Sequence, residues 1–173
     1  MTWERRHEPR SAGAGERALT ARGPTVAAPA PVLVGVDGSA DGARALEWAT
    51  IRALAGHSSL HIVHVVRGHV RLDPSGLLVS WEFEPLESAQ RVLDEAASSA
   101  RGKAPQLWIS TALCDGDATA ALLREGRAAE LIVLGQRKLR GEPGWLHPSL
   151  TTRVARHARG RVVLVGPDDE ILV

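Results

Sequence analysis

The stretch VLVGVDGSADGARALEWA, residues 32–49, contains the change of hydrophobic pattern that decides the fold class. It opens with a continuous run of apolar residues, which is typical of a parallel strand buried on both faces of a sheet. The run ends at Asp37, and Gly38 and Ser39 turn the chain. Apolar residues then recur at helical spacing. The sequence therefore predicts a strand over residues 31–37 that is followed directly by a helix.

The helix after this strand is marked at both ends. Ser39 or Asp41 can cap its first turn, because a side-chain oxygen there can accept a hydrogen bond from an unpaired backbone N–H. Gly56 favours the end of the helix. The predicted buried face consists of Leu46, Ala49 and Ala53. Trp48 in this helix and Trp108 in the third predicted strand are both expected to be partly buried.

The rest of the chain repeats this alternation of strand and helix. Short apolar runs predict further strands at residues 60–66, 106–114, 131–135 and 161–166. Helical spacing predicts helices over about 85–100, from Asp117 onward and over 149–157. Before the helix over about residues 85–100 we expect only a polar connection, with Pro74 and Gly76. The pattern predicts an α/β fold in which an open parallel sheet carries helices on both faces.

The composition is that of an ordinary globular domain. The chain has 173 residues, of which 44% are apolar and 24% charged, and its formal net charge is +1. This small net charge does not indicate DNA binding. The longest apolar runs are too short to cross a bilayer. The single cysteine, Cys114, cannot form an internal disulfide, and we expect it to be a buried apolar residue. We expect a cytoplasmic protein without DNA or membrane partners.

Residues 1–30 differ from the rest of the chain. They are rich in arginine, are broken by glycine and proline, and show no sustained apolar period. We therefore expect a disordered tail over residues 1–30 and a single domain over residues 31–173. Arg5 and Arg6 do not indicate a twin-arginine export signal, because no apolar region follows them. The tail is interpreted as a solvated segment, with an electrostatic tether to an acidic partner as the alternative.

Ligands of open parallel sheets bind beyond the carboxyl ends of the strands, where the winding direction reverses. Asp37 follows the first strand, and thirteen residues rich in Gly, Pro, Lys and Arg separate Gly135 from Ser149 at the start of the last helix. A helix N-terminus with a hydroxyl and nearby cations suits an anion. The same residues allow a purely structural interpretation, in which Asp37 and Ser149 cap the turns after them and Gly135 ends a strand.

Several catalytic and metal-binding classes lack their motifs. The chain has neither the G-x-G-x-x-G turn of dinucleotide-binding domains nor the G-x4-G-K-[ST] loop of P-loop ATPases. His61 and His64 are three residues apart on a strand, so they should point to opposite faces and serve packing. No Ser/His/Asp or Cys/His arrangement can be justified. We therefore expect no enzyme, no catalytic residues and no metal site.

Four segments together resemble a universal stress protein domain: VLVGVDGSADGARALEWA, LHIVHVV, CDGDATAALLREGRAAELIVLG and HPSLTTRVARHARGRVVLVG. The resemblance covers residues 31 to about 166 and keeps the family's order of segments. It implies an open five-stranded parallel sheet ordered 3-2-1-4-5, a Rossmann-like fold of the adenine nucleotide alpha hydrolase-like type. It also implies a stress-response or signalling role, a homodimer formed through the last strand, and, in many members, an ATP site between strands one and four.

The resemblance also implies site residues. In nucleotide-binding members, the acidic residue after the first strand contacts the nucleoside, and a backbone group on the second strand meets adenine; Asp37 and Val65 match these positions. The family's phosphate loop reads G-x2-G-x9-G-[ST]. Gly135 and Ser149 match its two ends with the spacing intact, and Leu150 follows as a further candidate contact. The implied cofactor is ATP or another adenine nucleotide, accompanied by Mg²⁺.

The loop departs from the family pattern at two positions, where Lys138 replaces the second glycine and Pro148 the third. Proline has no backbone N–H, so one donor to phosphate is missing, and such a bond to a charged group contributes about 1.5–3 kcal/mol. Lys138 can instead offer an ammonium group. We predict a weakened ATP site that tolerates AMP or another adenine ligand. The alternative is a ligand-independent dimeric scaffold that acts through protein partners.

The last predicted strand agrees with the dimer that the resemblance implies. Residues 162–165 are all apolar, and an edge of that kind is normally paired or protected. We expect an isologous homodimer through this strand. The chain end, residues 166–173, is an alternative cover for the same edge.

Overall fold

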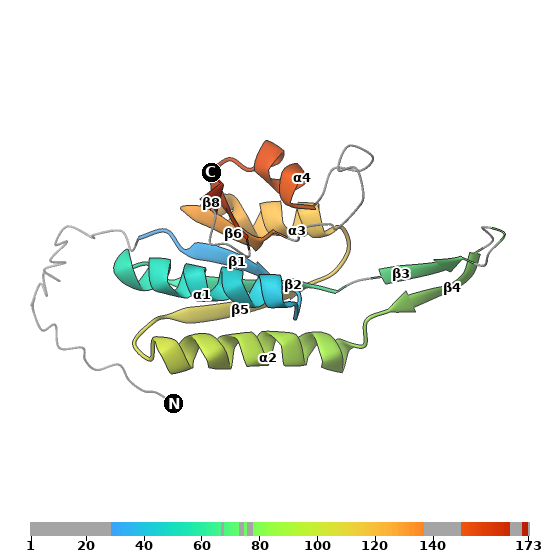
Figure 1. Ribbon diagram of the computed structural model, residues 1–173, viewed down its shortest axis with the longest axis horizontal. Helices are drawn as coiled ribbons and strands as arrows, with labels where there is room; N and C mark the ends of the chain where they lie inside the picture. Colours follow the sequence, from blue (N-terminus) through green and yellow to red (C-terminus); the bar gives the residue numbers. More distant parts are fainter. Residues whose placement is uncertain are drawn as a thin grey trace, which may run out of the picture.

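The computed structural model describes residues 29–66, 68–72, 75, 78–136, 150–166 and 171–172. Its main sheet has six strands in the order β5-β2-β1-β6-β7-β8, and a separate two-stranded sheet pairs β3 with β4. Strands β5, β2, β1, β6 and β7 are mutually parallel. Numbered along the chain, these five parallel strands have the order 3-2-1-4-5 (Figure 1). The expected fold class and strand order are therefore confirmed.

The parallel strands lie where the apolar runs predicted them. They are β1 (Val32–Val36), β2 (Leu60–Val65), β5 (Ile109–Cys114), β6 (Leu131–Gly135) and β7 (Arg161–Val165). Strand β5 starts later than the predicted residue 106. The reason is a turn before it, in which the Leu107 N–H donates to the Ala104 carbonyl at 3.0 Å.

The helices also follow the sequence signals. They are α1 (Ala40–Ala55), α2 (Leu86–Lys103), α3 (Ala118–Glu125) with the short η1 (Gly126–Ala128), and α4 (Leu150–His157). Ser39 caps α1 by accepting from the Gly42 N–H, and Gly56 follows its last turn. Asp117 caps α3 in the same manner. No helix in the described part of the chain has the length and apolarity needed to span a membrane.

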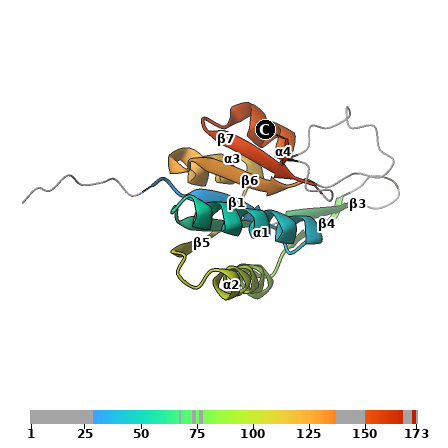
Figure 2. The same ribbon diagram turned by 60° about the vertical axis from the view of Figure 1, so that its left-hand side comes forward.

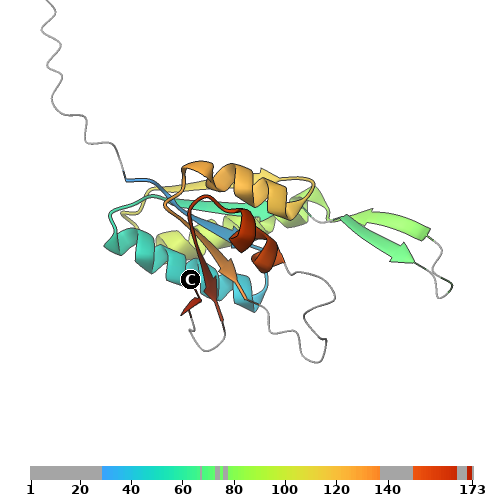
Figure 3. The ribbon, with the colours of Figure 1, turned by 90° about the horizontal axis from the view of Figure 1, so that it is seen from above.

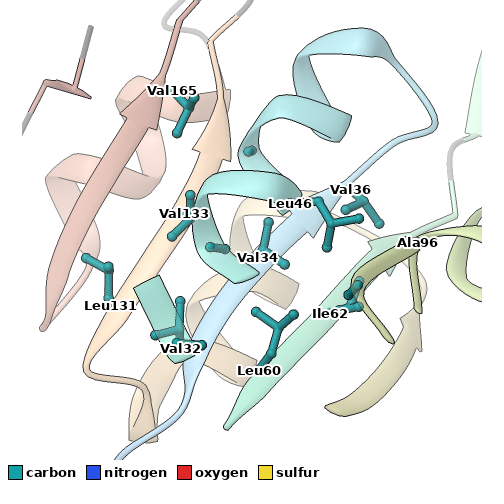
Figure 4. Packing of buried hydrophobic residues seen from close by; sticks show 14 of the residues in the cluster. Val32, Val34, Val36, Leu46, Leu60, Ile62, Ala96, Leu131, Val133 and Val165 are labelled. Atoms are coloured by element: carbon teal, nitrogen blue, oxygen red, sulfur yellow. The ribbon is translucent and has the colours of Figure 1, made fainter. Parts of the chain in front are cut away.

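Alternate residues of the central strands enter two separate cores. Val34 and Ile62 belong to the core beneath α1 and α2, whereas Leu33, Val63 and Ile132 belong to the core beneath α3 and α4. Figure 2 shows the sheet between these helix pairs, and Figure 4 shows residues of the first core packed against α1. Because both faces are covered, the strands read as continuous apolar runs.

Two short elements were not predicted as such. Strands β3 (Gly68–Leu72) and β4 (Leu78–Phe83) form an antiparallel hairpin where the sequence indicated only a polar connection. The hairpin projects from the body of the molecule (Figures 1 and 3). The missed signal is the alternation of apolar and polar residues on each side of Pro74 and Gly76, which is typical of a hairpin.

Among the described residues, the edge at β7 is covered by a strand at one end only. Strand β8 (Ile171–Leu172) pairs antiparallel with Leu164 and Val165, so the chain end does lie against this edge. The prediction for Trp108 is wrong, because its side chain is 78% exposed. Trp108 directly precedes β5, at the amino edge of the sheet. Trp48, in contrast, packs against the first core as expected.

Candidate functional site

A pocket opens at the carboxyl edge of the sheet, between the ends of β1 and β6. Its cavity has a volume of about 100 Å³ and opens to solvent, so it is smaller than the roughly 300–1,000 Å³ of typical small-molecule sites. Four predicted site residues line it together: Asp37, Val65, Gly135 and Leu150. The other two, Lys138 and Ser149, lie outside the described residues.

The wall on the α1 side is built from a chain of hydrogen bonds. Asp37 Oδ1 accepts from the Ser39 N–H at 3.0 Å and also from the Ser39 hydroxyl. The Ser39 oxygen accepts in turn from the Gly42 N–H at 3.1 Å. The carboxylate is thus tied to the first turn of α1 while it faces the pocket. Asp37 therefore shapes the turn, as the structural interpretation expects, and it also lines the cavity.

Two glycines bring the backbone of this wall close together. A Cβ at Gly135 would meet the carbonyl carbon and oxygen of Asp41 at 2.5 Å, and one at Gly42 would meet Asp37 Oδ1 at 2.8 Å. The structure shows close approach of α1 to Gly135, which also lines the pocket. Gly42 was missed, although glycine inside a helix is unfavourable and therefore signals a steric need.

The opposite wall is apolar. Val63 and Val65 from β2, Leu122 from α3 and Leu134 from β6 line it, and Leu150 from α4 completes it. Val65 is nearly buried at the end of its strand. A flat apolar ring system can lie against such a surface, because its transfer from water is favourable.

The charges of the described lining are unusual for a phosphate site. Asp37 and Asp41 line the pocket, and no basic side chain does so within the described residues. Leu150 and Thr151 form the first turn of α4 at the other side, and the backbone N–H groups of a helix start attract anions. Polar donors of a ligand therefore suit the α1 side, and an anionic group suits the α4 side.

The start of α3, next to this pocket, is held by charge. Asp117 Oδ1 accepts from the Ala120 N–H at 2.8 Å, and Oδ2 lies 3.2 Å from Arg153 Nη2 on α4. The backbone N–H of Ala120 and, after it, the Arg153 guanidinium hold the pKa of Asp117 below its ordinary value. This ion pair links α3 to α4, and Ala118, next to Asp117, lines the pocket.

His61 and His64 on β2 make contacts that are typical of residues with a structural role. His64 is buried, and its Nδ1 donates to the Val36 carbonyl at 2.8 Å, whereas His61 Nδ1 lies 2.8 Å from Ser110 Oγ. The two histidines contact elements on opposite faces of the sheet, as predicted, since His64 reaches Glu84 before α2 and His61 faces Glu125 at the end of α3. The described residues hold no cluster of three or more metal-ligating side chains.

Cys114 is buried at the end of β5, as predicted. Burial is the main cause that raises the pKa of its thiol, and the nearby Glu125 carboxylate adds to the effect. The thiolate is therefore disfavoured, which makes this cysteine a weak nucleophile.

Comparison with known proteins gives one consistent result. A sequence profile of the universal stress protein family matches residues 30–166. A universal stress protein of Mycolicibacterium smegmatis is 26% identical over 147 residues, which cover 80% of this chain and 49% of the relative. A universal stress protein of Mycobacterium tuberculosis is 29% identical over 154 residues, which cover 78% of this chain and 47% of the relative. The chain thus spans about half the length of these curated relatives.

A solved structure of a universal stress protein in complex with cAMP has the same fold. It superposes with a TM-score of 0.63 at 26% identity, and the match covers 80% of this chain and 98% of that protein. In contrast to the curated relatives, this protein is matched over nearly its whole length.

Proposed function

The chain belongs to the universal stress protein family, and on that premise we propose that it binds an adenine nucleotide in the pocket at the carboxyl edge of its sheet. The observation that carries the proposal is that Asp37, Gly135 and Leu150, far apart in sequence, line one cavity. The position is the switch point at which open α/β sheets bind ligands. The relative that forms a complex with cAMP supports the ligand class.

The chemistry of the walls gives the ligand an orientation. The Asp37 carboxylate accepts hydrogen bonds from hydroxyl groups, so it suits the ribose. The apolar wall around Val65 suits the adenine ring. The phosphate then points to the first turn of α4, where Leu150 and Thr151 lie and where, among the described residues, no carboxylate lines the pocket.

A short phosphate chain fits this site better than a long one. Pro148 removes one backbone donor from the loop that holds the outer phosphates in the family pattern, and Lys138 places a side chain where that pattern has glycine. Both residues lie outside the described part of the chain. We propose that AMP or cAMP binds more tightly than ATP, and that Mg²⁺ does not reverse this order.

A ligand-independent scaffold is the second candidate. It is favoured by the finding that Asp37 Oδ1 already accepts from both the backbone N–H and the hydroxyl of Ser39. Because Asp37 orders the turn before α1, an aspartate at this position is useful to the fold even without a ligand. Under this proposal the fold is kept for partner proteins, and no nucleotide raises the melting temperature.

The cellular role stays a proposal at the level of the family. We propose a cytoplasmic, non-enzymatic protein of stress response or signalling whose surface responds to the bound nucleotide. We also propose a homodimer. The expectation from the sequence places its interface on β7. Within the part of the chain that the structure describes, β8 pairs with Leu164 and Val165 and not with Arg161 to Val163.

Isothermal titration calorimetry tests the proposal. We expect cAMP or AMP to bind the full chain with a dissociation constant in the micromolar range, and ATP to bind more weakly with and without Mg²⁺. Asp37→Asn should weaken binding at least tenfold, because a charged acceptor is lost. Asp94→Asn, the same change on the exposed face of α2, is the matched control. Absence of binding for all three nucleotides would favour the scaffold.

A second variant tests the explanation for ATP. Pro148→Gly restores a backbone N–H and should raise ATP affinity by about tenfold or more, while AMP affinity changes little. Equal gains for ATP and AMP would contradict the assignment of Pro148 to the outer phosphates.

A further inference from the structure

The buried side chain of His64 has a hydrogen-bond acceptor at each of its two ring nitrogens. It is 2% exposed, its Nδ1 lies 2.8 Å from the Val36 carbonyl oxygen, and its Nε2 lies 3.1 Å from Glu84 Oε2. A carbonyl oxygen and an ionised carboxylate can only accept hydrogen bonds, and a neutral imidazole carries only one N–H. A neutral His64 beside an ionised Glu84 would therefore leave one of the two contacts without a hydrogen.

One additional proton satisfies both contacts of the histidine. Without it, a nitrogen lone pair of His64 faces a lone pair of Glu84 at a buried position, where water cannot separate them. With it, the pair is either an imidazolium beside a carboxylate or an imidazole beside a carboxylic acid. Both forms contain the same hydrogen bond between Nε2 and Oε2, so the proton belongs to the pair rather than to one partner.

The other charged groups around His64 have the same sign as Glu84. Like the other even-numbered residues of β2, His64 lies on the face that α1 and α2 cover, and the buried residues of both helices are uncharged. Its neighbour on β5 is apolar. Two further carboxylates belong to this region: Asp37 follows Val36 at the end of β1, and Glu95 of α2 lines a groove together with Val36. Both favour a positive charge on His64.

The contact with Val36 joins the two strand ends that carry the expected nucleoside contacts. Val36 immediately precedes Asp37 at the end of β1, and His64 immediately precedes Val65 at the end of β2. Val36, Asp37 and Val65 all line the pocket, whereas His64 is not part of its described lining. The ring of His64 therefore acts on the site through the backbone, as a positioning residue that fixes one strand end against the other.

Glu84 connects the same contact to the hairpin. The hairpin leaves the sheet after β2, and the chain returns through β4, which ends at Phe83, before α2 begins at Leu86 (Figure 1). Glu84 lies in this link, so its contact with His64 fastens the base of the hairpin to the sheet. The proton of the pair thus holds together the ends of β1 and β2 and the start of the link to α2.

We propose that His64 and Glu84 hold one proton between them and that this proton positions the strand ends at the pocket, so that nucleotide affinity falls when the pair loses it at higher pH. Loss of the proton leaves Nε2 facing a carboxylate oxygen without a hydrogen, which drives Glu84 away and frees the imidazole to turn from the Val36 carbonyl. The effect on affinity rests on the proposed function, whereas the shared proton does not.

Amide NMR on the ligand-free full chain tests the shared proton. We expect the N–H signals of Asp37 and Val65 to shift together between about pH 6 and about pH 8.5, a range in which histidines change charge. In Glu84→Gln the side-chain amide can donate to Nε2, so a neutral His64 satisfies both contacts, and these shift changes should shrink at least about threefold. Glu125→Gln is the matched control, because Glu125 faces the other histidine of β2 at 3.6 Å, and it should keep them. Shift changes that persist in Glu84→Gln, or that are absent from the parent, would overturn the proposal.

Calorimetry with cAMP at the two ends of this pH range tests the effect on affinity. The phosphodiester of cAMP keeps one negative charge throughout, whereas a phosphate monoester such as AMP loses its second proton near about pH 6. We expect the affinity to fall about threefold or more from low to high pH in the parent and in Glu125→Gln, and by less than about twofold in Glu84→Gln. Circular dichroism checks that both variants are folded.

The outcomes separate this inference from the proposed function. Equal cAMP affinity of the parent at both pH values would overturn the inference and leave the proposed function intact. Absence of cAMP binding at either pH would contradict the proposed function and, with it, the effect on affinity, and the amide shifts of the ligand-free chain would still decide whether the proton is shared.

Discussion

The helices α1 and α3 both start beside the pocket, but they are held there by different forces. The first turn of α1 packs so closely on β6 that a Cβ at Gly135 would lie 2.5 Å from Asp41 backbone atoms. The start of α3 is held by Asp117, whose side chain is 53% exposed and pairs with Arg153. The α1 wall therefore depends on steric fit and on the hydrogen bonds of Asp37 and Ser39, whereas the α3 wall depends in part on an exposed ion pair.

The largest loss of stability is expected at Gly135, where α1 packs very closely on β6. Gly135→Ala pushes β6 and α1 apart and should lower the free energy of unfolding by about 1–3 kcal/mol, as measured by urea denaturation. The loss should be the same at low and high salt. Gly102→Ala is the control, because nothing lies within 4 Å of its Cβ position in α2. That variant should gain about 0.5–1 kcal/mol.

A smaller effect is expected at the cap of α1. Ser39→Ala removes the acceptor for the Gly42 N–H and the hydroxyl donor to Asp37, and the loss of such a cap costs about 0.5–2 kcal/mol. Because Asp37 also loses a contact that orients it, nucleotide affinity should fall as well. Urea denaturation and calorimetry on the same variant measure both quantities. A loss of stability with unchanged affinity would separate the cap from the site.

The smallest effect is expected at α3 and depends on pH. Asp117→Asn keeps an acceptor for the Ala120 N–H but removes the charge that pairs with Arg153. Because the folded-state pKa of Asp117 lies below the ordinary value of 3.8, the charge stabilises the fold above that pH, and its contribution is lost as the pH falls through the folded-state pKa.

Thermal denaturation from pH 7 down to pH 3 measures this dependence. The variant should be less stable than the parent at pH 7, by less than about 1 kcal/mol because both side chains are largely exposed. The difference should shrink below about pH 4. A difference that stays constant across this range would show that the ion pair contributes nothing to the α3 wall.

The sequence predicted the features of the α1 and α3 walls that depend on neighbouring residues in the chain. The caps at Ser39 and Asp117 were recognisable because short polar side chains preceded helical periods. Asp37, Val65, Gly135 and Leu150 came from the family resemblance, and the structure places all four at one cavity. Their meeting follows from the strand order, because β1 and β6 are neighbours despite the distance between them in the chain.

The remaining features depend on contacts that no local pattern contains. The reason for glycine at position 135 is the backbone of Asp41, which only the packing of α1 on β6 brings near. The exposure of Trp108 arises because the chain turns at Ala104 before β5 begins. Among the described residues, β5 is the terminal strand of the main sheet, a place that the sequence pattern of an apolar strand does not reveal.

Amide NMR on the full chain, titrated with cAMP, tests the central claim most directly, because each backbone N–H reports on its own surroundings. The account predicts that the largest shift changes fall on the pocket, at Ser39, Gly42, Gly135 and Thr151, and that Asp37→Asn abolishes them at the same cAMP concentration. Changes centred on another surface, such as the amino edge of the sheet around Trp108, or no changes at millimolar cAMP, would contradict it.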